Sequence, residues 1–147
     1  MRYSRDFDQN SSVAASAAVG WDMRMLLLAD EGAPALAHRL AALAGGVETE
    51  ADPARALARV IEDPLHFGLI VADCDSLGGA EAGERLNQTL VALGLDLPLI
   101  LLGRDFVRQD FPAIRARPTC LRAPVSTISL RVGFEHALRD RLAPRAA

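Results

Sequence analysis

The amino-acid sequence predicts a single α/β domain in which helices cover both faces of a five-stranded parallel sheet, an arrangement called doubly wound. Its length of 147 residues suits one domain with one hydrophobic core. Four short, mainly apolar runs and one weaker strand-like segment at 47–51 alternate with segments that carry apolar residues at helical spacing. The apolar runs are continuous, which is typical of strands buried on both faces of a parallel sheet. The alternation predicts right-handed crossovers between neighbouring parallel strands.

The predicted elements follow one another in a regular order. Strands are expected at 23–29, 47–51, 67–72, 97–102 and 119–122. Helices are expected at 34–44, 53–63, 80–93, 104–117 and 128–142. Pro34 and Pro53 suit first helical turns, and Asp52 has the position and side chain of an N-cap. The helix at 104–117 is a weak prediction because Pro112 interrupts it, and 73–79 are expected to form a loop.

The chain is predicted to have three parts. Residues 1–22 are polar and then rich in Ala and Ser, and they form an N-terminal extension or arm whose Trp21 is expected to pack against the domain edge. The domain covers 23–142, and 143–147 form a tail. No apolar run approaches the roughly 18–20 residues that span a bilayer, and the N-terminus does not fit a secretory signal. We therefore predict a cytoplasmic protein without a membrane contact.

Charge and cysteine content exclude several classes of site. All 16 basic residues are arginine, so no lysine ammonium is present in the chain. The net charge of −3 gives no sign of a nucleic-acid-binding surface. Cys74 and Cys120 lie in strand-like surroundings and are expected to be free, buried thiols. A zinc site is not expected, because the chain has only these two cysteines and three scattered histidines.

The candidate site lies after the predicted strands, since doubly wound sheets bind ligands at the carboxyl ends of their strands. Asp30 follows the first strand and Asp73 the third. These strands are normally neighbours, so the two carboxylates are expected to face each other across one crevice. There they would bind a hard cation such as Mg²⁺ or share a proton. The alternative is that such aspartates cap helices and form turns, and we favour this reading for Asp75 and Asp105.

In order and spacing, residues 23–142 resemble the receiver domain of bacterial two-component response regulators. The resemblance rests on the stretches MLLLADE, FGLIVAD, PLILLG and CLRAP at the first, third, fourth and fifth predicted strands. It implies a flavodoxin-like sheet with the strand order 2-1-3-4-5. It also implies a site in which acids hold Mg²⁺, an aspartate accepts a phosphoryl group, and a hydroxyl and a lysine bind the phosphoryl oxygens.

Matched residue by residue, this site is incomplete. The acidic pair falls on Ala29 and Asp30, and the phosphoacceptor falls on Asp73, so Asp30 and Asp73 are the candidate Mg²⁺ ligands. The hydroxyl position falls on Gly103 and the lysine position on Ala123. Each lost charge-assisted hydrogen bond costs roughly 1.5–3 kcal/mol. Strand alternation points the neighbouring Arg122 to the opposite face, unless a bulge or twist brings it round.

Three functions remain open from the sequence. The first is a pseudo-receiver, a receiver-like signalling module without enzyme activity. It would bind a signalling protein or dimerise through its last helix, and it would need no cofactor. The second is an atypical receiver that is phosphorylated on Asp73, with Mg²⁺ held by Asp30. The third is a small-molecule-binding flavodoxin-like domain. It is disfavoured because no glycine-rich nucleotide loop is present and the loop after the first strand is acidic.

Overall fold

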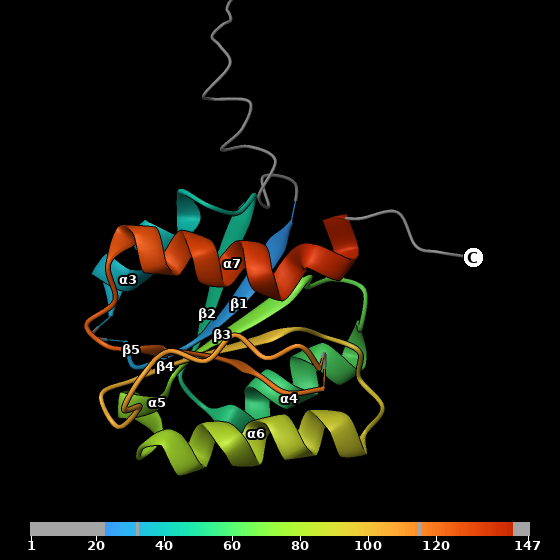
Figure 1. Ribbon diagram of the computed structural model, residues 1–147. Helices are drawn as coiled ribbons and strands as arrows, with labels where there is room; N and C mark the ends of the chain where they lie inside the picture. The colour runs from blue at the N-terminus through green and yellow to red at the C-terminus, as the bar shows by residue number, and fades with distance from the viewer. Residues whose placement is uncertain (1–22, 32, 115, 143–147) are drawn as a thin grey trace, which may run out of the picture.

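The computed structural model describes residues 23–31, 33–114 and 116–142, with the side chains of 140–142 excepted (Figure 1). The predicted arm at 1–22, with Trp21, and the predicted tail at 143–147 lie outside the described residues. No helix in the described ranges has the length and apolar character needed to cross a membrane.

The core of the fold is a five-stranded sheet in which every neighbouring pair of strands is parallel. The strands are β1 (Arg24–Leu28), β2 (Gly46–Glu50), β3 (Leu69–Asp73), β4 (Leu99–Gly103) and β5 (Thr119–Arg122). Their order across the sheet is β2-β1-β3-β4-β5. The predicted fold class and strand order are therefore confirmed.

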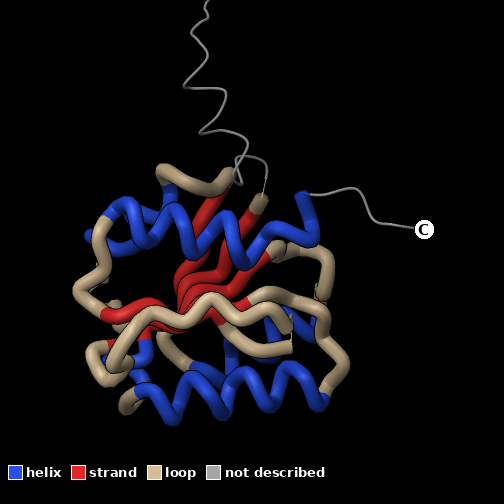
Figure 2. Tube along the Cα trace, in the orientation of Figure 1, coloured by secondary structure: helices blue, strands red, loops and turns tan. Residues whose placement is uncertain are grey.

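Helices cover both faces of this sheet, as Figure 2 shows. They are α3 (Pro34–Ala41), α4 (Pro53–Glu62), α5 (Cys74–Leu77), α6 (Ala80–Ala92) and α7 (Thr127–Leu142). Helices α3 and α7 lie on one face, and α4, α5 and α6 lie on the other (Figure 1). Each face has its own apolar cluster. One is centred on Leu40 of α3 and Phe134 of α7, and the other on Val60 of α4 and Leu86 of α6.

Two of the predicted helix starts follow from local chemistry. Pro34 and Pro53 stand in the first turns of α3 and α4, where the missing N–H costs no hydrogen bond. The Asp52 carboxylate accepts a hydrogen bond from the backbone N–H of Ala54 at 3.0 Å, so it caps α4 as predicted.

The prediction of a helix at 104–117 is wrong. The described residues between β4 and β5 form turns and irregular structure, and Asp110 instead makes an antiparallel bridge with Cys120 of β5. Two backbone hydrogen bonds of 2.8 and 2.9 Å hold that bridge. Pro112 cannot donate to a helix, whereas the edge of β5 offers partners for this backbone.

The loop predicted at 73–79 contains one short helix, α5. The Ser76 hydroxyl donates to the Asp73 carboxylate at 2.8 Å and so closes the turn at its start. Gly78 ends it with a φ of 108°, a conformation that other residues rarely adopt.

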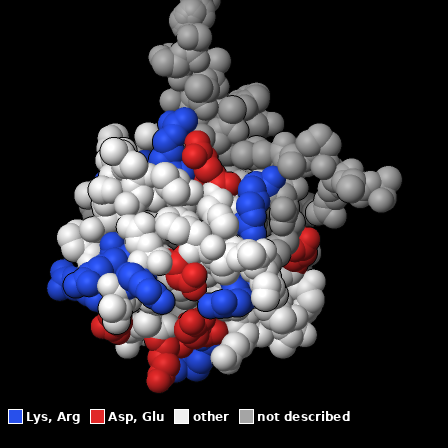
Figure 3. Space-filling view, in the orientation of Figure 1, with Lys and Arg blue, Asp and Glu red and all other residues white. Residues whose placement is uncertain are grey.

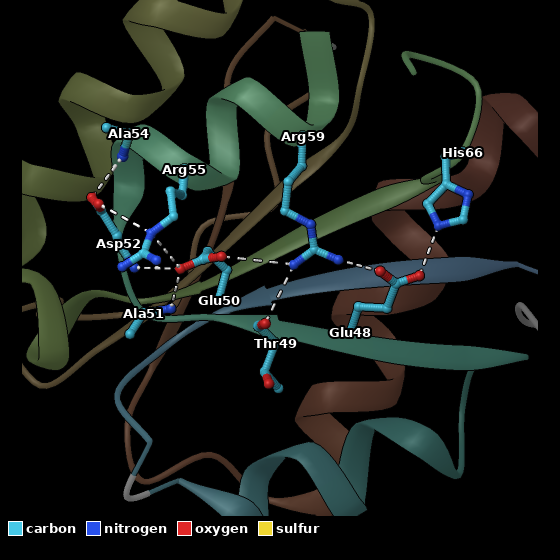
Figure 4. A network of polar contacts seen from close by, with 9 residues as sticks. All are labelled: Glu48, Thr49, Glu50, Ala51, Asp52, Ala54, Arg55, Arg59 and His66. Carbon is cyan, nitrogen blue, oxygen red and sulfur yellow. Dashed lines mark hydrogen bonds and ion pairs between the residues drawn. The ribbon is translucent and has the colours of Figure 1, made fainter. Parts of the chain in front are cut away.

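The edge strand β2 is fastened to α4 by a polar network (Figure 4). The Glu48 carboxylate contacts Arg59 of α4, His66 at 2.7 Å and Arg24 of β1 at 3.5 Å. The Glu50 carboxylate accepts two backbone hydrogen bonds of 3.1 Å from the start of the loop that leads to α4. These contacts explain why a strand with two glutamates in five residues is still part of the sheet.

We predict that this network makes stability depend on pH in the acid range. The hydrogen bond from His66 lowers the pKa of Glu48 below its ordinary value of 4.5, assisted by nearby arginines and opposed by burial. A lowered folded-state pKa adds stability above the unfolded value, and this stability is lost as the pH falls through the folded value. Glu48→Gln should lower the urea midpoint at pH 7 and flatten its fall below pH 4.5.

The matched control for that variant is Glu81→Gln. Glu81 lies on α6, is 91 % exposed and makes one ion pair with Arg85 at 3.4 Å. Exposed pairs of this kind contribute little to stability, so this variant should leave the pH profile almost unchanged. Equal profiles for the two variants would contradict the role given to Glu48.

Candidate functional site

The candidate phosphoacceptor, Asp73, is the last residue of β3 and opens the candidate site. It pairs in register with Leu102 of β4, so its side chain stands at the carboxyl edge of the sheet. The carboxylate is half-buried and already accepts the Ser76 hydroxyl at 2.8 Å. Asp73 therefore has the position predicted for it, with one carboxylate oxygen engaged by its own loop.

Asp30 lies in a different setting. It is exposed and lines a hollow of about 420 Å³ at the ends of β1 and β2, together with Glu31, Glu50 and Arg55. The residues that line this hollow do not include Asp73. Nor do the described residues contain a group of three or more His, Cys, Asp or Glu side chains placed to hold a metal. The described residues therefore supply no third ligand of these types beside Asp30 and Asp73, and the Mg²⁺ centre stays a prediction.

Gly103 stands at the position predicted for a phosphoryl-binding hydroxyl. The ring of Phe106 packs against it. Gly103 is buried at the end of β4. A Cβ atom on Gly103 would meet the Phe106 ring at 3.2 and 3.3 Å and the Cβ of Cys74 at 3.4 Å. A serine or threonine here would push the Phe106 ring by a few tenths of an ångström, so the ring packs closely over the position predicted for the hydroxyl.

Two further aspartates tie the loop after β3 to the loop after β4. The Asp75 carboxylate accepts a hydrogen bond from the backbone N–H of Arg104, with oxygens at 3.1 and 3.3 Å. The Asp105 carboxylate accepts one from the N–H of Ala80, the first residue of α6, at 3.2 Å. Both aspartates therefore have the structural roles that the sequence favoured, and we call this pair of contacts the loop latch.

The fifth strand brings no cation to Asp73. Arg122 is exposed, and its guanidinium donates to the carbonyl of Val107 at 3.0 Å, toward the segment between β4 and β5. Ala123 stands at the lysine position, and its N–H donates to the Gly103 carbonyl at 3.0 Å. The guanidinium of Arg122 is thus directed as strand alternation predicts.

The two cysteines near the site are buried free thiols, as predicted. Burial raises the pKa of both Cys74 and Cys120 from 9.0 to about 12, and neighbouring carboxylates act in the same direction. A thiol with a raised pKa is not a nucleophile near neutral pH, because the reactive form is the thiolate. Neither cysteine is therefore a candidate catalytic group.

These thiols give a testable prediction. A raised folded-state pKa adds stability that is complete below pH 9 and is lost as the pH rises toward about 12. Both thiols should resist iodoacetamide at pH 8 in the native protein and react at once in urea. The Cys74→Ala variant should show a smaller loss of stability between pH 9 and 11 than the parent. Rapid native alkylation would contradict the burial described for them.

Comparisons with known proteins support the same fold. No family model matches the chain, and no curated protein matches it. Among solved structures, the FixJ-N structure superposes with a TM-score of 0.62 at 21 % identity, over 80 % of this chain and 94 % of that one. The fold is that of a response regulator receiver domain.

Two other receiver structures agree with this assignment. A receiver domain protein from Clostridium thermocellum gives a TM-score of 0.59 at 15 % identity, over 81 % of this chain and 96 % of that one. The PhyR response regulator REC domain of Erythrobacter litoralis gives 0.55 at 22 % identity, over 88 % and 99 %. At these identities the likeness concerns the fold, and the function has to be argued from the site.

Sequence reasoning found the strand-end positions of the site but not what fills them. It placed Asp73, Gly103 and Ala123 at the carboxyl edge, where the structure has them. It missed Phe106 and the loop latch. The only available signal was the acidic and aromatic character of the residues directly after β4, read together with the missing hydroxyl at Gly103.

Proposed function

We propose that this chain is a receiver-like signalling module that acts by binding a protein partner, without a phosphorylation cycle. The observation that carries the proposal is the packing of Phe106 over Gly103, at the position where a receiver would bind phosphoryl oxygens. The loop latch adds to it, because the two loops that a phosphoryl group would have to bridge are already joined by side-chain carboxylates.

Electrostatics support the same proposal. Phosphoryl transfer at such a site depends on positioning and on neutralising the charge of the phosphoryl group. Here the surrounding loops contribute the carboxylates of Asp73, Asp75 and Asp105, and the chain has no lysine. The guanidinium of Arg104 lies 3.9 Å from the Asp75 carboxylate, and the Arg104 side chain is 82 % exposed. It is therefore a poor substitute for a lysine ammonium held in the site.

A labelling experiment tests the proposal. The full chain is incubated with acetyl phosphate or phosphoramidate and excess Mg²⁺, and intact mass spectrometry follows the gain of one phosphoryl group. We expect no stoichiometric gain and the same spectrum for Asp73→Asn. Stoichiometric labelling that disappears in Asp73→Asn would instead establish the atypical receiver, in which the Ser76 hydroxyl would have to release the Asp73 carboxylate.

A further inference from the structure

A hollow lies between α4 and α6, on the face of the sheet opposite α3 and α7 (Figure 1). Its volume is about 240 Å³, and we call it the α4–α6 hollow. Pro53 and Leu57 line it from α4, one helical turn apart, and Ala82 and Leu86 line it from α6 with the same spacing. Leu28, the fully buried last residue of β1, lines it from the sheet. Two helices and the sheet therefore enclose this space.

The lining of the α4–α6 hollow suits an apolar molecule with one anionic group. Of the eight described residues that line it, six are apolar. The hydroxyl of a seventh, Thr89, already donates to the backbone carbonyl of Arg85 at 3.0 Å. The guanidinium of Arg85 is the only charged group in this lining. Small-molecule sites combine an apolar lining with a few polar groups that orient the ligand, and here the orienting group is a cation.

The charge of Arg85 is weakly engaged by the protein itself. Its guanidinium lies 3.4 Å from the carboxylate of Glu81, one helical turn earlier on α6, whereas a strong hydrogen bond between such groups is about 2.7–2.9 Å long. Glu81 is 91 % exposed, and an exposed pair contributes little because water competes for both charges. Figure 3 shows acidic and basic side chains next to one another over α6. An anion inside the hollow can therefore replace Glu81 at this guanidinium.

The α4–α6 hollow also reaches the loop that carries the candidate site. Leu77, the last residue of α5, is part of its lining. Helix α5 begins at Cys74, directly after Asp73, and its Asp75 belongs to the loop latch. Asp73 itself does not line the hollow. A ligand here would contact α5 without occupying the position of a phosphoryl group.

We propose that the α4–α6 hollow binds a small amphiphilic anion, a single short alkyl chain that ends in a carboxylate. The chain would lie between Leu57 and Leu86, and the carboxylate would pair with Arg85. The hollow is smaller than the pockets of roughly 300–1,000 Å³ that hold drug-sized ligands, which limits the ligand to one short chain. The inference goes beyond the proposed function, because it assigns a small ligand to a place that Asp73 does not line.

Isothermal titration calorimetry on the full chain tests the proposal. The probe is sodium octanoate, and octylammonium chloride is its counterpart of opposite charge. We expect saturable binding of one octanoate, weakened by added salt, and binding of octylammonium that is weaker by about tenfold or more. Butyrate buries less of an alkyl chain and should also bind more weakly than octanoate by about tenfold or more.

Two substitutions in the lining should reduce octanoate binding. Ala82→Phe fills the hollow from α6 and should abolish binding. Arg85→Gln removes the cation, so it should weaken octanoate binding about tenfold and remove the preference over octylammonium. Arg85 is 65 % exposed, so this second variant tests the proposal even where Ala82→Phe does not fold.

Matched variants outside the lining serve as controls. Ala92→Phe places the same ring at an exposed position of α6. Arg117→Gln removes an arginine that is 60 % exposed and paired with Asp110 at 3.1 Å. Both variants should bind octanoate like the parent. Asp73→Asn should do the same, because Asp73 does not line the hollow.

Several results would overturn the proposal. They are a lack of saturable octanoate binding by the parent, equal binding of octanoate and octylammonium, and unchanged binding by folded Ala82→Phe or Arg85→Gln. Tighter binding by Asp73→Asn would place the anion at the candidate site instead. Cosedimentation with phosphatidylglycerol vesicles would indicate a lipid surface in place of a free carboxylate. Phosphoryl labelling of Asp73 bears on the proposed function alone, so octanoate binding by a labelled protein would keep this inference and reject phosphorylation independence.

Discussion

Replacing Phe134 with alanine is expected to destabilise the fold by roughly 3–5 kcal/mol. Phe134 lies on α7, is fully buried and is the largest side chain of the cluster that joins α7 to the sheet. Its ring shares that cluster with Leu102 of β4 and Leu121 of β5. Removing it forfeits the burial of the ring and leaves a cavity that rigid neighbouring strands cannot fill. For a domain with about 5–15 kcal/mol of stability this is a large fraction of the total.

Urea unfolding of the parent and the variant, followed by circular dichroism, measures this loss. Phe111→Ala is the matched control, since it removes the same ring from a side chain that is 37 % exposed in the segment between β4 and β5. The control should cost a small part of the loss at Phe134. A similar midpoint for both variants would mean that α7 is not anchored through this ring.

The parts of the fold that sequence reasoning recovered are those fixed by local chemistry or by burial on two faces. The stretches of β1, β3 and β4 are continuously apolar, so neither face of these strands is suited to contact with water. In the structure both faces are almost completely buried. The edge strand β2 is polar, and the prolines and glycines on either side of it gave its position. Its glutamates are compensated by arginines of β1 and α4, which no local pattern reveals.

The segment between β4 and β5 shows where this reasoning fails. Its backbone partners lie on three other elements: Cys120 of β5, Asn87 of α6 and Arg139 of α7. Spacing within the segment carries no information about them. The same holds for the site, where the positions of Asp73 and Gly103 follow from strand ends but the packing of Phe106 depends on the path of this segment.

Gly83→Val should destabilise the fold by roughly 1–3 kcal/mol and disturb the candidate site as well. Gly83 is buried in α6 where that helix approaches the sheet. A Cβ atom there would lie 2.6 Å from the Sγ of Cys74 and 2.9 Å from a methyl group of Leu101. A mid-helix glycine normally costs about 1 kcal/mol relative to alanine, so added side-chain bulk would ordinarily help the helix. At position 83 the close approach of Cys74 and Leu101 makes added side-chain bulk destabilising instead.

The control is Gln88→Val, which places the same side chain at an exposed position of the same helix and should change stability by a few tenths of a kcal/mol. Cys74 directly follows Asp73, so a side chain at position 83 that pushes Cys74 away also moves the candidate phosphoacceptor. We therefore expect Gly83→Val to expose the Cys74 thiol to iodoacetamide at pH 8, while Gln88→Val leaves it protected. A stable Gly83→Val protein with a protected thiol would show that α6 can shift outward without disturbing β3, and that the site does not depend on this contact.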